Sequence, residues 1–253
     1  MAKHPELEIV IPVYNEGETI VRVLEGLKHS VKTPFRVLVC YDHDEDNTLQ
    51  ALADYSPETF ELQFVKNQGK GAFGAVITGF RTSTAPAVLV FPADDDFNGP
   101  QIDPMVEAFR AGADIVAASR FVAGGKMVGC PWLKATLVRS SAFVLYHLAG
   151  LPTRDASNGF RLFSRRVLES IPIESSMGFT YSIELLVKTH RLGWKIAEVP
   201  SSWFERKSGQ SRFQVIQWLP GYLVWFRYAF ATSFLGRGPE TVKRLSAPEA
   251  VQR

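Results

Sequence analysis

The sequence predicts an α/β protein built on a mostly parallel sheet with helices on both faces. Two observations lead to this prediction. Short β-branched apolar runs, typical of buried strands, alternate with segments of helical periodicity, and polar loops directly follow several of these runs. In a parallel sheet the loops at the carboxyl ends of the strands form the ligand site, so these polar loops are expected to share one crevice.

The first strand is expected at residues 7–13, followed by a turn at 15–17. Asn15 is expected to cap the next helix, with Glu18 as the partner residue of a capping box. The apolar residues that repeat there at helical spacing are Ile20, Val23, Leu24 and Leu27.

The later elements continue the alternation. Further strands are expected at 35–40, 60–65, 87–91 and 115–119. Helices are expected at 48–55, from the glycine-rich turn 67–71 through residue 80, at 103–111 and at 133–148. The glycines between 123 and 131 predict a mobile loop.

Residues 213–234 are long, apolar and rich in aromatic side chains, but polar residues, Pro220 and Arg227 interrupt them. A spanning helix needs about twenty mostly apolar residues, so this segment is expected either at a membrane interface or as a core helix. We divide the chain into a catalytic domain at 1–205, a basic loop with an amphipathic aromatic helix at 206–235, and a disordered tail at 236–253.

Composition argues against a nucleic-acid-binding protein and against a protein held together by disulfides. The chain has 253 residues, is 46% hydrophobic and 21% charged, and has a net charge of +2, which is too mild to indicate nucleic-acid binding. Two cysteines, Cys40 and Cys130, make no disulfide framework, which favours a reducing compartment. The polar first eight residues lack an apolar signal region, so we expect a cytoplasmic protein, with peripheral contact at the membrane face.

Three consecutive aspartates, Asp94, Asp95 and Asp96, directly follow a predicted strand. Like charges this close resist ionisation, and a divalent cation removes that conflict. Mg²⁺ and Mn²⁺ suit such oxygen ligands, and Mg²⁺ typically takes one or two carboxylates together with phosphate oxygens and water. A solvated acidic loop is the alternative. The triplet therefore predicts a Mg²⁺ or Mn²⁺ site that also holds phosphate.

Other motifs accompany the triplet in a fixed order, and together they resemble the family 2 glycosyltransferases, in particular the dolichol- or polyprenyl-phosphate sugar synthase branch. The resemblance covers roughly residues 7–230, and its strength lies in the order and spacing of the motifs. These are Ile11 to Glu16, Asp42 to Thr48, Asn67 to Gly71, Ala93 to Asp96, Ser119 to Phe121 with Gly124-Gly125, Asp155 with Asn158 to Arg161, Gly178-Phe179 with Glu184, Glu198 to Pro200, and Arg206 with Gly209, Ser211 and Arg212.

The resemblance implies the GT-A fold, a nucleotide-diphosphate-sugar donor and inversion at the anomeric carbon. Asp94 and Asp96 take the ends of the family's Asp-x-Asp motif and are the implied metal ligands and catalytic residues, while Asp95 fills a position that is usually small. The residues implied to contact the donor are Pro12, Tyr14, Glu16, Asp42, Lys70, Asp94, Asp95, Asn98, Arg206 and Arg212.

Several cations are candidate phosphate ligands, because Arg offers a bidentate fork and Lys a point charge. Arg120 and Lys134 are the candidates assigned to catalysis. Arg139 is a further candidate, and Arg206 and Arg212 flank a loop with Gly209 that is suited to close over a diphosphate. Lys70 does not belong to a P-loop, because the first glycine and the following Ser or Thr are missing.

Three functions compete. The first is transfer of a sugar from a donor of the GDP-mannose or UDP-glucose type to a polyprenyl or dolichyl phosphate, with peripheral contact to the membrane. The second is transfer to a sugar or protein hydroxyl, which needs a general base. Many hydroxyl-directed relatives have a late Glu-Asp pair, whereas Leu185 follows Glu184 here. The third is a non-catalytic nucleotide-sugar-binding protein. The absent pair favours the phosphate acceptor.

Overall fold

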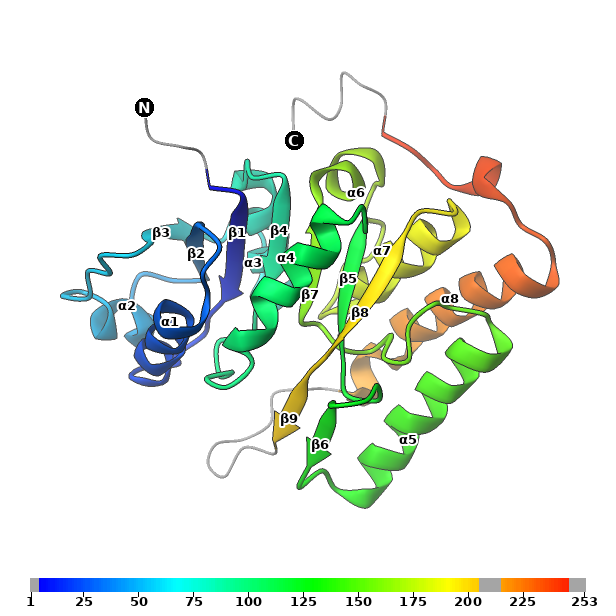
Figure 1. The fold of residues 1–253 in the computed structure, drawn as a ribbon, viewed down its shortest axis with the longest axis horizontal. Helices are drawn as coiled ribbons and strands as arrows, with labels where there is room; N and C mark the ends of the chain where they lie inside the picture. The colour runs from blue at the N-terminus through cyan, green and yellow to red at the C-terminus, as the bar shows by residue number, and fades with distance from the viewer. Residues whose placement is uncertain (1–4, 205–214, 246–253) are drawn as a thin grey trace.

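The computed structural model describes residues 5–204 and 215–245 (Figure 1). Within these residues, seven strands form one sheet in the order β3-β2-β1-β4-β7-β5-β8, and β6 pairs with β9 in a separate ribbon. The strands are β1 (Leu7–Pro12), β2 (Phe35–Tyr41), β3 (Glu61–Lys66), β4 (Ala87–Val90), β5 (Ile115–Ser119), β6 (Lys126–Val128), β7 (Arg161–Ser164), β8 (Ile196–Pro200) and β9 (Ser202–Phe204).

Helices connect and cover these strands. The α-helices are α1 (Thr19–Ser30), α2 (Asn47–Ala51), α3 (Gly71–Thr82), α4 (Ile102–Arg110), α5 (Trp132–Phe143), α6 (Arg165–Ser170), α7 (Thr180–Arg191) and α8 (Val215–Phe234). Two 3₁₀ turns, η1 (Gly99–Gln101) and η3 (Pro239–Thr241), and one π-helical segment, η2 (Val144–Leu148), complete the described chain.

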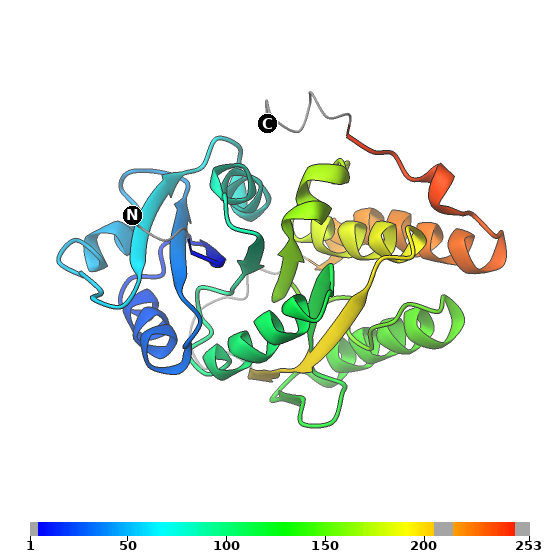
Figure 2. The ribbon, with the colours of Figure 1, turned by 45° about the horizontal axis from the view of Figure 1, so that its top comes forward.

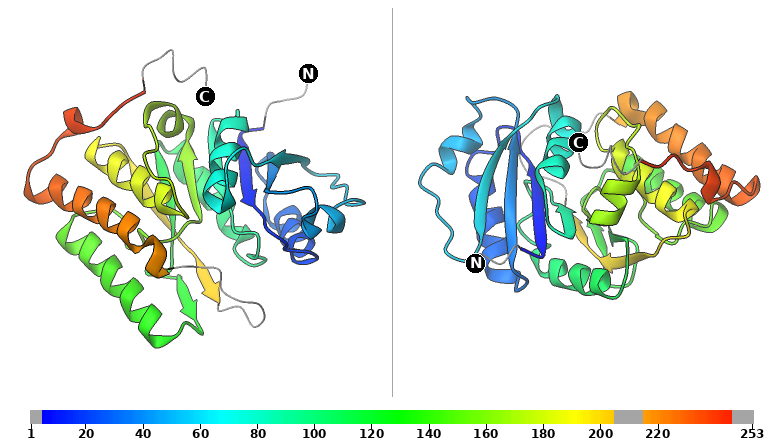
Figure 3. Two further views of the ribbon diagram at one scale, coloured as in Figure 1. Left: turned by 180° about the vertical axis from the view of Figure 1, so that it is seen from behind. Right: turned by 90° about the horizontal axis from the view of Figure 1, so that it is seen from above.

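The sheet is buried on both faces, as a mostly parallel sheet requires. Along β1, Ile9 and Ile11 pack on one side with α1 and α4, and Val10 packs on the other with α3 and α7. The two helical layers are seen in Figure 2 and from above in Figure 3. The predicted α/β fold class is confirmed: the chain has a GT-A-like fold.

Strand direction decides which loops meet. β1 pairs in parallel with β2 and β4, β2 with β3, and β5 with β8. Only β7, among the described strands of this sheet, runs in the opposite sense, since it is antiparallel to both of its neighbours β4 and β5. The loops after β1, β2, β3, β4, β5 and β8 therefore share one edge with the loop that precedes β7.

Helix α8 has two different sides. Trp225 and Ala229 are buried against the core, whereas Leu219, Leu223 and Val224 are about half exposed. The helix runs beside α7 and lies alongside the α5–η2 segment, where the Ser233 hydroxyl donates to the carbonyl of Ala149 (Figures 1 and 3). Within the described residues, no helix is long and apolar enough to cross a membrane.

Several local predictions are wrong. Asn15 does not cap α1: it adopts φ 54°, and the helix begins after Glu18 without a side-chain cap. The helix expected at 48–55 ends at Ala51, where Leu52 leaves helical geometry. The expected loop 123–131 includes β6, because a distant strand, β9, supplies its hydrogen-bonding partner.

The expected tail is ordered in its first part. Residues 236–245 include η3, and Val242 is buried against the second core cluster. The Lys243 ammonium donates to the Glu174 carboxylate at 2.5 Å, which ties this segment to the body of the protein. Residues 246–253 lie outside the described residues.

Candidate active site

The loop after β1 is held in place by Asp46 and the first residues of α2. The backbone N–H of Asn15 donates to the Asp46 carboxylate at 3.0 Å, and that of Glu16 donates to the Thr48 hydroxyl at 3.0 Å. The N–H of Gly17 donates to the Asn47 side chain at 2.9 Å. Because the 46–48 segment satisfies these donors, the backbone at Asn15 keeps its left-handed conformation and the turn keeps a fixed shape.

Three residues that are predicted to contact the nucleotide-sugar lie on or directly before this loop. Pro12 is half-buried at the end of β1, Glu16 is half-buried and Tyr14 is 44% exposed. The Tyr14 ring meets the His43 ring edge-on, with centroids 5.5 Å apart. An exposed aromatic ring at this edge is a surface on which a nucleobase could stack.

Asp42, at the end of β2, bridges to the glycine-rich turn. One carboxylate oxygen accepts from the Asn67 amide at 2.5 Å, and the other accepts from the N–H of Gly71 at 3.1 Å. Lys70 is exposed at the N-cap position of α3. Asp42 and Lys70 are thus placed on neighbouring loops, after β2 and β3.

The aspartate triplet is divided by burial. Asp95 is 8% exposed, and it accepts hydrogen bonds from the N–H groups of Phe97 and Asn98 at 3.2 and 2.9 Å and from the Asn98 amide at 2.6 Å. Burial raises the pKa of Asp95 to about 6 in spite of these bonds. The buried Asp95 carboxylate therefore holds the shape of the loop. This role explains why the position has a larger residue than the family usually has there.

Asn98 is the second residue that fixes this loop. It is buried, its amide donates to the carbonyl of Ser202 at 2.7 Å, and its carbonyl accepts from the N–H of Ser202 at 2.9 Å. Both ends of the side chain are engaged, so the triplet loop is tied to β9. Asp95 and Asn98 thus hold the loop in position, and their contact with the donor stays a prediction.

Asp94 and Asp96 are the outer members of the triplet. Asp94 is half-buried and Asp96 is 46% exposed, with the Arg22 guanidinium 3.7 Å from its carboxylate. Among residues 5–204 and 215–245, no group of three or more acidic, His or Cys side chains is arranged to hold a metal ion. Two carboxylates are enough for Mg²⁺ when substrate phosphate and water complete its shell, so the donor set fits a metal that arrives with the nucleotide.

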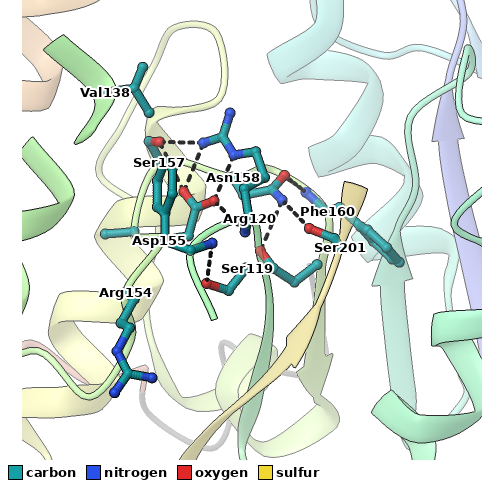
Figure 4. Close-up of polar contacts among 12 residues, drawn as sticks. Ser119, Arg120, Val138, Arg154, Asp155, Ser157, Asn158, Phe160 and Ser201 are labelled. Atoms are coloured by element: carbon teal, nitrogen blue, oxygen red, sulfur yellow. Dashed lines mark hydrogen bonds and ion pairs between the residues drawn. The ribbon is translucent and has the colours of Figure 1, made fainter. Parts of the chain in front are cut away.

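Arg120 is clamped by a fully buried carboxylate (Figure 4). Its Nε and Nη2 donate to the two oxygens of Asp155 at 2.6 and 2.8 Å, and its backbone N–H donates to the same carboxylate at 3.0 Å. Nη2 also donates to the Ser157 hydroxyl at 2.9 Å. Within the described chain Nη1 makes no hydrogen bond, so this end of the fork remains for a ligand.

Hydrogen bonds from the side chains of Asn158 and Arg161 hold the loop that carries Asp155. The Asn158 amide donates to the carbonyl of Ala118 at 2.9 Å and to the Ser201 hydroxyl at 3.3 Å, which joins the loop before β7 to strand β5 and to the residue after β8 (Figure 4). Below it, Arg161 is fully buried and donates to the carbonyls of Asp155 and Ala156 at 3.3 Å. Burial lowers the pKa of Arg161 to about 10. The sequence motifs contained Asp155 and Asn158 but gave them no role.

The other predicted cations are dispersed. Lys134 is half-buried on α5, with its ammonium 4.8 Å from the centre of the Trp203 ring. Arg139, one turn further along α5, lines a pocket with Arg154 and does not join Arg120. Arg206 and Arg212 lie outside the described residues.

Glu184 is a structural residue. It is fully buried on α7, where its carboxylate accepts from the N–H groups of Glu174 and Ser175 at 2.6 and 2.8 Å and from the Lys188 ammonium at 2.6 Å. A carboxylate with these three donors and no exposure is not placed to take a proton from a hydroxyl acceptor.

Comparison with known proteins identifies the class. The sequence profile of glycosyl transferase family 2 matches residues 8–171. The chain therefore belongs to the family 2 glycosyltransferases.

Individual relatives are similar over most of the chain. The chain is 32% identical over 211 residues to the undecaprenyl-phosphate mannosyltransferase of Micrococcus luteus, with 80% of this chain and 85% of that protein covered. It is 28% identical over 228 residues to the polyprenol monophosphomannose synthase of Mycolicibacterium smegmatis, with 83% and 85% covered.

Solved structures share the fold. Glucosyl-3-phosphoglycerate synthase from Mycobacterium tuberculosis, in complex with Mn²⁺, UDP-glucose and phosphoglyceric acid, superposes with a TM-score of 0.66. The two chains are 17% identical, and 90% of this chain and 80% of that one are covered.

Asp46→Asn is expected to lower the free energy of unfolding by about 1 kcal/mol near neutral pH, since a hydrogen bond to a charged group is stronger than one to a neutral group. Burial by itself raises the pKa of Asp46, but hydrogen bonds from Thr48 and Asn15 outweigh burial and hold the pKa below its usual value. The stability from a depressed carboxyl pKa is present above the unfolded pKa of about 4 and is lost as pH falls through the folded pKa. Urea unfolding at neutral and acidic pH measures this. An equal difference at both pH values would show that the charge is not responsible.

Glu184→Gln is expected to destabilise the fold by about 3–5 kcal/mol, because it leaves Lys188 as a buried cation without its closest carboxylate. Glu174→Gln is the matched control: Glu174 also accepts from Lys188, at 2.8 Å, but its side chain is 38% exposed. That control should cost less than about 1 kcal/mol. Thermal unfolding compares the two variants. A folded Glu184→Gln enzyme of unchanged stability that has lost transfer would mean that Glu184 is the general base.

Proposed function

We propose that the chain transfers a sugar, with inversion, from a nucleotide-diphosphate sugar of the GDP-mannose or UDP-glucose type to a polyprenyl or dolichyl phosphate. The relatives from Micrococcus luteus and Mycolicibacterium smegmatis support the acceptor class by their names, and the fold neighbour crystallised with UDP-glucose supports the donor class. The single structural observation on which the proposal depends is the Asp155-clamped Arg120, whose Nη1 is left for a phosphate.

The donor lies, in this proposal, across the loops after β1, β2, β3 and β4. Tyr14, with Pro12 and Glu16, contacts the base, Asp42 the ribose, and Lys70 the diphosphate. Arg206 and Arg212 are proposed to close over the diphosphate. Asp94 and Asp96 hold Mg²⁺ or Mn²⁺ against the diphosphate, and the metal ion supplies positive charge that offsets the charge of the leaving group.

The acceptor phosphate needs cations that bind it, but it needs no general base to activate it. A phosphate monoester is already an anion, so one of its oxygens attacks the anomeric carbon directly while the bond from that carbon to the donor diphosphate breaks on the opposite face. Arg120 and Lys134 orient the acceptor phosphate and reduce its repulsion from the donor. Burial of Glu184 in its contacts with Lys188 and two backbone N–H groups argues against the alternative of a hydroxyl acceptor.

A lipid acceptor requires contact with a membrane surface, and α5 and α8 offer one. These adjacent helices expose large apolar side chains that a purely aqueous surface would not favour. The exposed residues are Trp132, Leu133, Leu137, Phe143 and Leu148 on α5 and η2, and Leu219, Leu223, Val224, Phe234 and Leu235 on or directly after α8.

Asp96→Ala is expected to cut sugar transfer by on the order of a hundredfold and to leave folding intact, because this half-exposed side chain adds little to packing. EDTA should abolish the activity of the unmodified enzyme, and Mn²⁺ or Mg²⁺ should restore it. Asp54→Ala, at an exposed site away from the loops, is the control and should behave like the unmodified chain. Full activity in EDTA would disprove the metal assignment.

Transfer of radiolabelled sugar tests the acceptor, with undecaprenyl and dolichyl phosphate set against soluble sugars and 3-phosphoglycerate. Label should enter the lipid phosphates. Arg120→Lys, which keeps a charge beside Asp155 but removes the fork, and Lys134→Ala should each reduce transfer roughly tenfold to hundredfold, since a hydrogen bond to a charged group contributes about 1.5–3 kcal/mol. Lys32→Ala, on the opposite edge of the sheet, is the control. Label that enters only a hydroxyl acceptor would overturn the proposal, and donor binding without turnover would indicate a non-catalytic binding protein.

A further inference from the structure

A pocket borders the candidate active site on the side of α5. It has a volume of about 230 Å³ and opens between the second half of α5, η2 and the loops after β5 and before β7. Its walls combine aromatic rings with two guanidinium groups. The lining residues are Phe121, Arg139, Ala142, Phe143, Tyr146, His147 and Arg154.

Neither of the two guanidinium groups forms an ion pair within the described chain. Among residues 5–204 and 215–245, no carboxylate oxygen lies within 4.0 Å of a guanidinium nitrogen of Arg139 or Arg154, although the backbone N–H of Arg154 donates to the Glu198 carboxylate. By contrast, Arg110 pairs with Glu6 and Arg120 pairs with Asp155. Arg154 lies over the Tyr146 ring, 5.0 Å from its centre, and its Nη2 donates to the Tyr146 hydroxyl at 3.4 Å. Two exposed cations on one pocket, neither of them in an ion pair within the described chain, favour an anionic ligand.

The π-helical segment η2 gives the pocket its aromatic wall. The N–H of Ala149 donates to the carbonyl of Val144, five residues earlier, so the helix is locally wider than an α-helix. The His147 ring then lies 4.5 Å from the Phe143 ring and 4.8 Å from the Tyr146 ring, measured between centroids. These side chains make a wall that suits the apolar part of an amphiphile.

The pocket is next to the Arg120 clamp but faces away from it. Phe121 lines the pocket, and the preceding Arg120 has its guanidinium carbon 5.4 Å from the centre of that ring. Figure 4 shows the Arg154 side chain pointing away from the Arg120–Asp155 pair. Around the pocket, Phe143 and Leu148 are 60% and 51% exposed, so apolar surface borders the two cations.

We propose that this pocket binds the phosphodiester headgroup of an anionic membrane phospholipid, with Arg139 and Arg154 on the phosphate and the aromatic wall against the glycerol and upper acyl region. This inference rests on the proposed transfer to a lipid phosphate, which brings α5 to a membrane. Arginine suits phosphate because its planar fork donates two parallel hydrogen bonds. Binding of the headgroup holds η2 at the membrane surface. It thereby fixes how far Arg120 lies from the membrane and so from the acceptor phosphate.

The test is cosedimentation of the full chain with vesicles of phosphatidylcholine that contain increasing fractions of phosphatidylglycerol. Arg154→Gln and Arg139→Gln should each weaken binding about tenfold or more, because each removes charge-assisted hydrogen bonds to the phosphate. Arg166→Gln is the matched control: Arg166 also lies over an aromatic ring, that of Trp194, at 3.8 Å, but on α6. The control should bind as the unmodified chain does. Thermal unfolding verifies that each variant is folded.

Two further measurements separate the possible outcomes. On vesicles with the same negative charge from a fatty acid, Arg154→Gln should lose no more than the roughly fivefold expected for one cation near an anionic surface. An equal loss on both kinds of vesicle would show that Arg154 senses surface charge only, and would overturn the inference. Transfer to a short-chain, water-soluble polyprenyl phosphate should be unchanged in Arg154→Gln. If Arg154→Gln impairs that transfer, the pocket belongs to the acceptor site and the inference is wrong. Equal binding of Arg154→Gln and Arg166→Gln to phosphatidylglycerol vesicles would also overturn it. Failure of the unmodified chain to transfer sugar to any lipid phosphate would refute the proposed function instead.

Discussion

The buried contact between Asp155 and Arg120 is the interaction on which the candidate site depends. It exists because β7 runs against its neighbours β4 and β5, which brings the loop before β7 to the same edge as the loop after β5. A fully buried carboxylate is costly unless several donors satisfy it, and Arg120 supplies three of them. The same contact fixes the direction of the guanidinium, so the reversed strand, the clamp and the free Nη1 form one arrangement.

The protein surrounds its other buried charges with hydrogen-bond donors or acceptors too, here from nearby residues. Asp95 draws on the backbone of its own turn, and Asn98 then links that turn to Ser202. Glu184 and Lys188 neutralise each other below the sheet. Because these groups are fully engaged, they keep the loops in place.

The molecule also has two distinct regions that suit phosphate, and helix α5 contributes to both. Lys134, early in the helix, lies near Trp203 and the β9 segment, whereas Arg139 lines the pocket that continues into the wider turns of η2. Under the proposed function, α5 links the position of a membrane surface to the position of the acceptor phosphate.

The sequence by itself determined the alternation of strands and helices, the loops after the strands and the family resemblance, because these depend on local periodicity and on the order of motifs. It also identified the Asp94 to Asp96 triplet and Arg120. Only the tertiary structure decided that Asp95 is buried while Asp96 is exposed, that Asn15 is held by Asp46 instead of capping α1, and that Glu184 is a structural residue. These outcomes depend on partners brought together by the fold: a local pattern shows which groups are charged, but burial and hydrogen-bond partners decide which of them remain available to a ligand.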